Sequence, residues 1–595
     1  MPRVADVVFD VPVPHPFSYR VPDDIALAAG QRVRAPLKGG PRTGLVVAVR
    51  DADDAALKPL TSVIDRAPIV SAAQLDLGRW IAAQSLSTLG STWAALLPPP
   101  DGGAGDGESV SRELGASTGA RPRLLTGHGR ERRLLERIAA TRGPSLVLVP
   151  DVDAAARWAT RLGKLGRVVR LDSGARVVPR ARIAVGTRSA LLAPLGADSL
   201  LALVDEHESA HKPPGAPRIH TRDVVLERAR RTPLQLALTA ATPSVEAWWR
   251  ADARRLELEA APPGPWPTVT VADTRGILRR EPITPPLARA MRDALAAGRR
   301  VFLGVSRLTA ALACDECGAI VRCETCGLSL AYSRAAASLT CRLCGVSRPL
   351  PDLCPSCQGR RLSPFGWSPE RVEHSVRRRF PKASVARYDP DGARGKRLDE
   401  QRRAAAHAEV VVGTRGALRL FGPASLGVAG FVAPDHLFRL PDFRAGERAF
   451  ALLWAAAERV RADGALVIQS QNPEHYAVDA LVRQELGVFY KEELKFRAEL
   501  GYPPFRRLAI VTITGKTAAD VEPLAASTFA SLRAATGLTA YPPAADRRGK
   551  ARRIVVKGGD DLPALLEAAL GEFRRPRAGS RGIMDVEVDP VEWPF

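Results

Sequence analysis

The stretch Cys314–Cys357, CDECGAIVRCETCGLSLAYSRAAASLTCRLCGVSRPLPDLCPSC, holds all 8 cysteines of a 595-residue chain. The cysteines form four Cys-x-x-Cys pairs. Such a turn places two sulfurs on one side of a tight backbone knuckle, and two turns supply the four thiolates of a tetrahedral zinc site. The spacing therefore predicts two Zn²⁺ ions in closed sites, which leave no position for water or substrate and so are structural.

Four pairs can be combined into two sites in three ways, and the spacing alone leaves the choice open. We predict a nested arrangement, in which one ion closes the base of a hairpin-like module and the other closes its tip. Zinc 1 would then take Cys314, Cys317, Cys354 and Cys357, and zinc 2 would take Cys323, Cys326, Cys341 and Cys344. Disulfides are disfavoured because the N-terminus lacks a secretory signal pattern, and iron–sulfur clusters use other cysteine runs.

The formal net charge is +22, from 86 Lys+Arg against 64 Asp+Glu. This surplus favours nucleic acid as a partner, although an arginine-rich composition on solvated faces would give the same total. No apolar run approaches the ~20 residues that cross a bilayer. We therefore expect a cytoplasmic, reduced protein that does not enter a membrane.

Length and pattern predict a multidomain α/β protein. Residues 1–97 alternate as a small β-rich domain closed by a helix, and residues 98–122 form a linker rich in Gly, Ser and Pro. Apolar runs alternating with helical stretches predict parallel sheets in two lobes, at 123–286 and 287–487, with the cysteine module inserted in the second lobe. Residues 488–595 are expected to form a separate α+β domain.

Several segments occur in a shared order, and together they carry a resemblance. They are VGTRSALLAP (185–194), PRIHTRDV (217–224), ATPS (241–244), FGWSPERVE (365–373, after the cysteine block), PDFRAGERAF (441–450), IQSQNPEH (468–475) and YPPF (502–505). Across nearly its whole length the chain resembles the PriA family of bacterial replication-restart proteins.

The resemblance implies a superfamily-2 helicase fold that recognises stalled forks and helps to reload the replicative helicase. Its parts would be an N-terminal domain that grips a DNA 3′ end, a winged helix, two motor lobes, a zinc module and a C-terminal DNA-binding domain. The winged helix is expected to be missing, because only the 98–122 linker stands at its place. The implied partners are forked and single-stranded DNA, primosome or helicase-loading proteins and single-stranded-DNA-binding protein, and we expect a monomer.

The helicase motifs depart from the family pattern. A phosphate loop needs G-x-x-x-x-G-K-[ST], but in the loop that begins at Gly127 arginines stand at glycine positions, Arg133 replaces the Lys and Leu134 replaces the Mg²⁺-binding hydroxyl. The acidic motif, with Asp205 and Glu206, is one residue short. Of the closing arginine motif only Arg459 is retained, with Glu458 at its first glycine. We therefore predict that the chain is not an ATPase and that Asp205, Glu206 and Arg459 support lobe packing.

The resemblance also assigns a pocket for a 3′-terminal nucleotide. Its aromatic-Asp-aromatic triplet is here Phe17-Ser18-Tyr19, its glycine position is Lys38, and its lysine matches Lys58. Because the acidic residue is replaced by serine, selectivity for a 3′ end is in doubt. Phe17 and Tyr19 lie two apart, so on a strand they share a face, as half of a core or as a platform for a base.

Three functions are compatible with these patterns. The first is a catalytically silent PriA-type protein that binds branched or single-stranded DNA. The second is a residual ATP-dependent 3′-to-5′ helicase with an atypical nucleotide site. The third is a zinc-dependent interaction platform whose DNA affinity is incidental.

Overall fold

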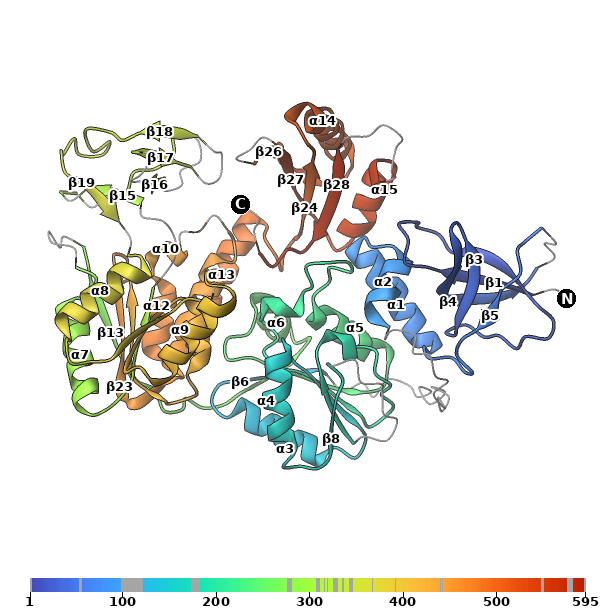
Figure 1. Cartoon of the computed structure of the whole chain (residues 1–595), viewed down its shortest axis with the longest axis horizontal. Coiled ribbons are helices and arrows are strands. Elements are labelled where there is room, and N and C mark those ends of the chain that lie inside the picture. Colours follow the sequence, from blue (N-terminus) through green and yellow to red (C-terminus); the bar gives the residue numbers. More distant parts are fainter. Residues whose placement is uncertain are drawn as a thin grey trace.

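The structure is a computed structural model that describes residues 3–52, 56–97, 121–172, 182–275, 281–305, 311–314, 316–317, 319–324, 330–333, 337–341, 346–365, 367–390, 392–438, 440, 442–546, 550–574 and 582–592. The described residues form five β-sheets. Figure 1 shows two helix-flanked sheets next to each other, with the N-terminal domain at one end of the molecule and the cysteine module at the other. The expected linker and the missing winged helix fall mostly on residues 98–120, which lie outside the described part.

The N-terminal domain is an antiparallel sheet in the order β2-β1-β4-β3-β5 with two helices. Its elements are β1 Arg3–Val8, β2 Phe17–Val21, β3 Arg32–Leu37, β4 Gly40–Asp51, β5 Ser62–Val63, α1 Ala72–Ser85 and α2 Leu89–Leu96. One face of β1 packs in the domain's own core through Val7, and the other packs beneath the helices, where Val8 shares a cluster with Trp93. The predicted small β-rich domain is confirmed.

Lobe 1 is a seven-stranded parallel sheet in the order β12-β6-β11-β10-β7-β9-β8. Its elements are β6 Arg123–Thr126, α3 Arg130–Ala140, β7 Ser145–Leu148, α4 Val152–Leu162, β8 Val168–Arg170, β9 Ile183–Gly186, β10 Leu200–Leu203, α5 Thr221–Arg231, β11 Gln235–Thr239, α6 Val245–Asp252 and β12 Glu257–Ala260. Every residue of β7 and β10 is buried, as expected for central strands covered by helices on both faces.

Lobe 2 is a six-stranded parallel sheet in the order β13-β23-β22-β14-β21-β20. Its elements are β13 Thr268–Asp273, α7 Pro285–Ala296, β14 Val301–Gly304, α8 Pro369–Arg379, β20 Val385–Tyr388, α9 Gly395–His407, β21 Val410–Gly413, β22 Leu426–Val432, α10 Asp435–Phe438, α11 Ala445–Ala457, β23 Val460–Ser470 and α12 Tyr476–Arg483. The expected lobe boundary at 286/287 needs correction, because β13 pairs with β23 in this second sheet. The prolines at 285–286 begin α7 and do not separate the lobes.

The C-terminal domain is an antiparallel sheet covered by two helices, which confirms the predicted α+β class. Its elements are β24 Arg507–Thr514, α14 Ala518–Ala534, β25 Thr539–Ala540, β26 Ala544–Ala545, β27 Ala551–Gly558, α15 Leu562–Arg574 and β28 Ile583–Val588. The boundary expected at 487/488 is too early. Helix α13, Leu486–Leu500, carries Phe489 and Tyr490 into the core cluster of lobe 2, where Phe489 stacks on Phe450 at 4.1 Å between ring centroids.

The cysteine module is a small antiparallel sheet between β14 and α8 of lobe 2. Its strands are β15 Ala311–Cys314, β16 Ala331–Ser333, β17 Ser338–Thr340, β18 Ser347–Pro349 and β19 Leu362–Phe365, in the order β18-β17-β16-β15-β19. Its cluster of buried residues contains four aliphatic side chains and two cysteines. So small a core gives the module little stability of its own.

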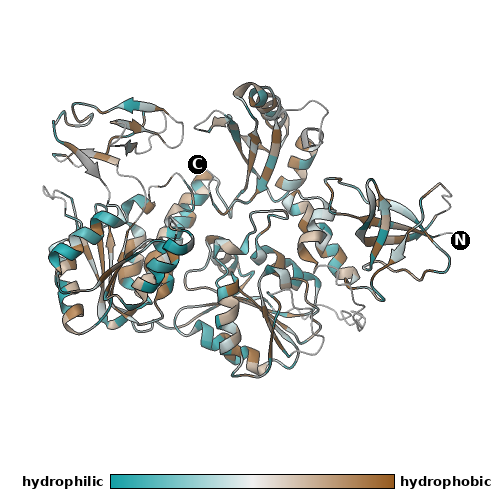
Figure 2. Cartoon of the chain, viewed as in Figure 1, coloured by the Kyte–Doolittle hydropathy of each residue, from teal (hydrophilic) through white to brown (hydrophobic). Residues whose placement is uncertain are grey.

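Hydropathy separates the interior from the surface. Figure 2 colours the strands of both lobes largely brown, the hydrophobic end of its scale, and gives the front helices of lobe 2 broad teal faces. Among the described residues, no helix combines the length and apolar character needed to span a membrane.

Candidate nucleic-acid interface and metal centre

The loop between β6 and α3 turns sharply at two glycines. Gly127 and Gly129 have φ values of 80° and 68°, and α3 starts at Arg130 directly after them. Positive φ is favourable for glycine, so the chain can turn sharply from strand to helix. Leu134, at the position of the Mg²⁺-binding hydroxyl, is 0% exposed within the core of lobe 1. The turn is retained, but the side chain at the metal position faces the core.

Arg133, at the position of the phosphate-binding Lys, bonds to the backbone of its own lobe. Its Nη1 donates to the carbonyl of Glu259 at 2.8 Å, and its Nη2 donates to the carbonyl of Thr126. Burial lowers the pKa of Arg133. The guanidinium is thus committed to the ends of two strands, where it cannot reach a phosphate over the loop.

Arg130 joins the loop to lobe 2. Its Nη1 and Nη2 donate to the two carboxylate oxygens of Glu458 at 2.7 and 2.9 Å, a bidentate pair with side chains only 15% and 23% exposed. Burial works against the charge, but Glu458 outweighs it and raises the pKa of Arg130. Both residues stand where the resemblance places glycines, so the pair fills space from both lobes at once.

The acidic pair after β10 has become part of the packing. Glu206 is 0% exposed and accepts hydrogen bonds from the Ser244 backbone N–H at 2.6 Å and its hydroxyl at 2.8 Å. Ser244 also caps α6. Asp205 has a φ of 50°, and burial raises the pKa of its carboxyl group. Glu206 therefore anchors the start of α6.

Arg459 likewise bonds within lobe 2. Its Nε donates to the carbonyls of Leu418 at 3.1 Å and Phe421 at 3.0 Å, and its Nη1 donates to the carbonyl of Ala455 at 2.6 Å. Burial lowers the pKa of Arg459. The hydrogen bonds of its side chain hold the end of α11 against the loop that precedes β22.

A buried network of charges lies between the lobes. Arg444, at the start of α11, binds both oxygens of Glu246 on α6 of lobe 1. Arg497 on α13 pairs with Glu447 and Glu493, each at 2.9 Å, and is 0% exposed. Because every member is paired, the network holds the two lobes and α13 in one arrangement.

A groove with a volume of about 1630 Å³ runs between the lobes and the C-terminal domain. Its cationic lining residues are Arg157, Lys212, Arg218, Arg222, Arg230, Arg250, Arg255, Arg402, Arg415, Arg419, Arg444, Arg448, Arg459, Arg506 and Arg507. The ten acidic residues that also line it are fewer. This excess of fixed positive charge in a concave site attracts a polyanion.

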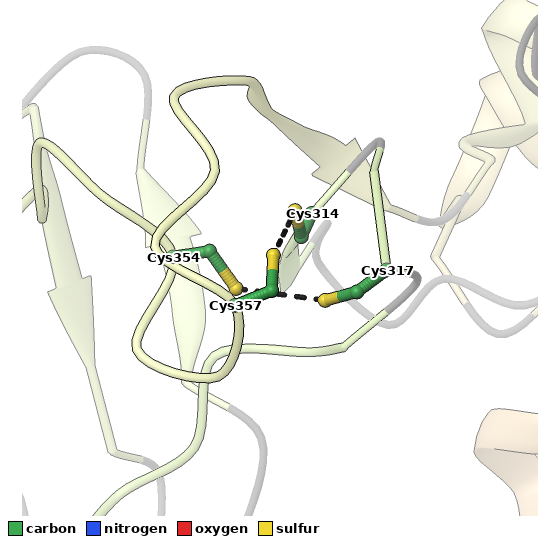
Figure 3. A group of neighbouring side chains, drawn as sticks. All are labelled: Cys314, Cys317, Cys354 and Cys357. Carbon is green, nitrogen blue, oxygen red and sulfur yellow. Dashed lines mark hydrogen bonds between the residues drawn. The ribbon is translucent and has the colours of Figure 1, made fainter.

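Figure 3 shows the sulfurs of Cys314, Cys317, Cys354 and Cys357 directed toward one another. All four lie within 4.8 Å of each other, with 3.6 Å between Cys314 and Cys357 and 3.7 Å between Cys317 and Cys354. Zn–S bonds of about 2.3 Å in a tetrahedron separate sulfurs by about 3.8 Å. The first and fourth pairs therefore fit one Zn²⁺, which is the combination that the nested arrangement requires.

Backbone donors support this cluster. The N–H of Glu316 points to the sulfur of Cys314 at 3.3 Å, and the N–H of Ser356 points to that of Cys354 at 3.4 Å. Of the second predicted set, Cys323 and Cys341 are buried in the module core, whereas Cys326 and Cys344 lie outside the described residues. The second zinc site stays a prediction.

Comparison with known proteins bears on both ends of the chain. Residues 6–98 match the family model described as the 3′ DNA-binding domain of PriA, and residues 498–591 match the Primosomal protein N C-terminal domain. The replication restart protein PriA of Treponema pallidum is 29% identical over 656 residues, which cover 98% of this chain and 99% of that relative. The chain thus carries two PriA-specific domains and is similar to a PriA protein along nearly its whole length.

A second PriA relative, that of Bacillus subtilis, is 28% identical over 506 residues and covers 78% of this chain. The match spans 63% of that relative. Among solved structures, the Escherichia coli DEAH/RHA helicase HrpB is similar with 15% identity and a TM-score of 0.33, over 59% of this chain and 40% of that one. The lobe assignment rests on the parallel sheets described above.

The PriA resemblance assigned four N-terminal residues to a DNA pocket. Phe17 and Tyr19 lie on β2, Lys38 lies in the turn between β3 and β4, and Lys58 lies just before β5. Tyr19 is 4% exposed, packs against Phe9 and donates its hydroxyl to the carbonyl of Pro36 at 2.9 Å. Its expected role as an exposed platform needs correction, because the ring is part of the domain core. Phe17 is half-buried, and the DNA contacts of Phe17, Lys38 and Lys58 stay predictions.

Sequence reasoning missed the partners of the altered motif residues. Arg130 and Glu458 were each recognised as replacements for glycine, but their pairing was not predicted. A signal existed, since a cation and an anion had entered two motifs that meet in this fold. The interlobe role of Arg444 and Glu447 within PDFRAGERAF had no local signal.

Proposed function

We propose that this chain is a cytoplasmic replication-restart protein that binds single-stranded and forked DNA without hydrolysing ATP. The absence of ATP hydrolysis is supported by the Arg130–Glu458 ion pair, which joins the loop before α3 to lobe 2. Phosphoryl transfer depends on a positioned metal and phosphate-binding cations. Leu134 offers no metal ligand, and Arg133 is bonded to strand carbonyls.

DNA binding is supported by three independent features. Family models for a 3′ DNA-binding domain and a primosomal C-terminal domain match the two ends of the chain. The formal net charge is +22, and arginines dominate the charged lining of the central groove. The cysteine module with two structural Zn²⁺ ions would then present a surface to partners, which we take to be primosome or helicase-loading proteins and single-stranded-DNA-binding protein.

One observation favours a second function. Asp205 and Glu206 keep the acidic pair that could hold Mg²⁺, so a residual ATP-dependent 3′-to-5′ helicase with a rearranged nucleotide site is the alternative. The two functions differ in their affinity for ATP. A helicase must bind ATP, whereas a protein that only binds DNA need not.

The deciding experiment measures ATP hydrolysis and binding by the purified protein with forked DNA present. If the protein binds DNA without using ATP, we expect no DNA-stimulated ATP turnover, and calorimetry should detect no binding of Mg·ATP. Turnover that disappears in an Asp205→Ala variant would establish the helicase instead. A parallel panel of forks, single strands and duplex tests the DNA half, and equal weak affinity for all three would contradict a restart protein.

A further inference from the structure

The rim of the groove where α6 meets the C-terminal domain carries aromatic side chains that the nucleotide site does not explain. Trp249 on α6 and Phe505 in the loop between α13 and β24 both line the groove. Their ring centroids are 6.2 Å apart at an interplanar angle of 66°. Phe505 is 42% exposed, so a large apolar ring faces solvent inside a concave site.

The two neighbouring tryptophans of α6 point in different directions. Trp248 stacks on Tyr490 at 4.3 Å and 13°, within the contact between lobe 1 and lobe 2. Trp249 follows it on the helix and is turned by about 100°, which brings it to Phe505. Core packing therefore accounts for Trp248 but leaves one edge of the Trp249–Phe505 pair open to the groove.

Cations surround this aromatic pair. The Arg255 guanidinium carbon lies 5.0 Å from the centroid of the Trp249 ring, and Arg255 forms no ion pair within the described part of the chain. Arg250 pairs with Asp223 at 3.0 Å, yet its buried Nη1 has no hydrogen-bond partner among the described residues. Arg506, beside Phe505, lines the same groove. The site thus offers ring faces and spare guanidinium donors together.

We propose that the Trp249–Phe505 pair is a stacking platform for the bases of single-stranded nucleic acid, with Arg255, Arg250 and Arg506 binding the adjacent phosphates. Aromatic rings beside a cationic track are the arrangement by which proteins bind single strands without reading sequence. The platform joins lobe 1 to the C-terminal domain, so a strand bound there would contact both. The proposal rests on the proposed DNA-binding function and adds a location to it.

The experiment measures binding of fluorescent oligo-dT by the full chain at one fixed salt concentration, because phosphate contacts vary with salt. Phe505→Ala and Trp249→Ala are each expected to weaken binding by about 5- to 150-fold, the range for loss of one base–aromatic stack. Phe505→Tyr should keep wild-type affinity, whereas Phe505→Leu should bind like Phe505→Ala. Oligo-U measured in parallel distinguishes RNA from DNA as the strand that binds.

A matched control is Phe496→Ala. Phe496 on α13 is 43% exposed, almost as much as Phe505, but does not line the groove. Its loss should leave affinity unchanged, and equal weakening by all three alanine variants would overturn the platform. Photocrosslinking of 5-iodouracil oligonucleotides should label Trp249 or Phe505, and labelling confined to other domains would also overturn it. If wild type binds no single strand at all, the proposed function fails; if it binds and the variants do not differ, only the platform fails.

Discussion

The loop before α3 and the cysteine cluster differ in how their polar side chains are paired. In the loop, Arg133 is bonded to the carbonyls of Glu259 and Thr126, and Arg130 to the carboxylate of Glu458. In the cluster, four sulfurs lie within 4.8 Å of one another. The loop residues are bonded to other groups of the chain, whereas the four sulfurs are placed so that they could share one metal ion.

A binding site keeps groups unsatisfied until its ligand arrives, and each such group costs stability in the empty protein. Arg130 and Glu458 lower this cost for their charged ends, since each neutralises the other.

The largest expected effect tests the cysteine side of the comparison. Removal of Zn²⁺ by a chelator should unfold the module, because each structural zinc contributes about 10 kcal/mol or more to folding. Metal analysis should give two ions per chain before treatment, and Cys354→Ser should lose one. Limited proteolysis between β14 and α8 should then show rapid cleavage. Retention of a protease-resistant module without metal would mean that the four sulfurs are satisfied in another way.

A smaller effect tests the buried ion pairs between the lobes. Replacing the fully buried Arg497 by Met would leave Glu447 and Glu493 without their shared cation. Breaking a buried pair in this way costs about 3–5 kcal/mol. The free energy of unfolding, measured with urea, should fall by that amount.

Arg483→Met is the matched control for Arg497→Met. Arg483 also pairs with a carboxylate four residues earlier, Asp479 at 2.8 Å, but both side chains are exposed. Its loss should change the free energy of unfolding by less than about 1 kcal/mol. Similar losses for the two variants would show that the interlobe charges do not hold the lobes together.

The sequence predicted what depends on local pattern. Parallel strands, the inserted module and the C-terminal α+β class follow from apolar runs and turn residues, and the cysteine spacing indicated the ligands. Domain edges were less predictable: β13 joins the sheet of lobe 2, and Phe489 and Tyr490 pack into its core. Short strands and aromatic pairs look alike on either side of a boundary, and only tertiary contacts decide their domain.

At the candidate site, too, contacts between distant parts of the chain could not be predicted from the sequence. The prediction that the loop holds no nucleotide rests on the size of Arg130, Arg133 and Leu134, and it stays a prediction. That Arg130 would find Glu458, 328 residues away, could not be predicted, because it depends on how close the two lobes lie. Tyr19 was assigned to a DNA pocket by its motif, but its hydroxyl and ring are used by the core. A motif identifies positions, whereas exposure decides which of them can meet a ligand.

The smallest effect concerns the histidine beneath the acidic pair. His211 is 1% exposed, its Nε2 lies 2.9 Å from the carbonyl of Val204, and burial lowers its pKa to about 4. In the unfolded chain the pKa is about 6.5, so between these values the unfolded state binds more protons and stability falls as the pH falls. From pH 7 to pH 5 the loss from this residue should be about 2 kcal/mol. A His211→Gln variant, whose amide can still donate to Val204, should lose less stability than wild type by that difference in urea unfolding at the two pH values. Because both proteins carry the same cysteine module, release of zinc at low pH affects them equally. An identical pH dependence would show that folding does not lower the pKa of His211.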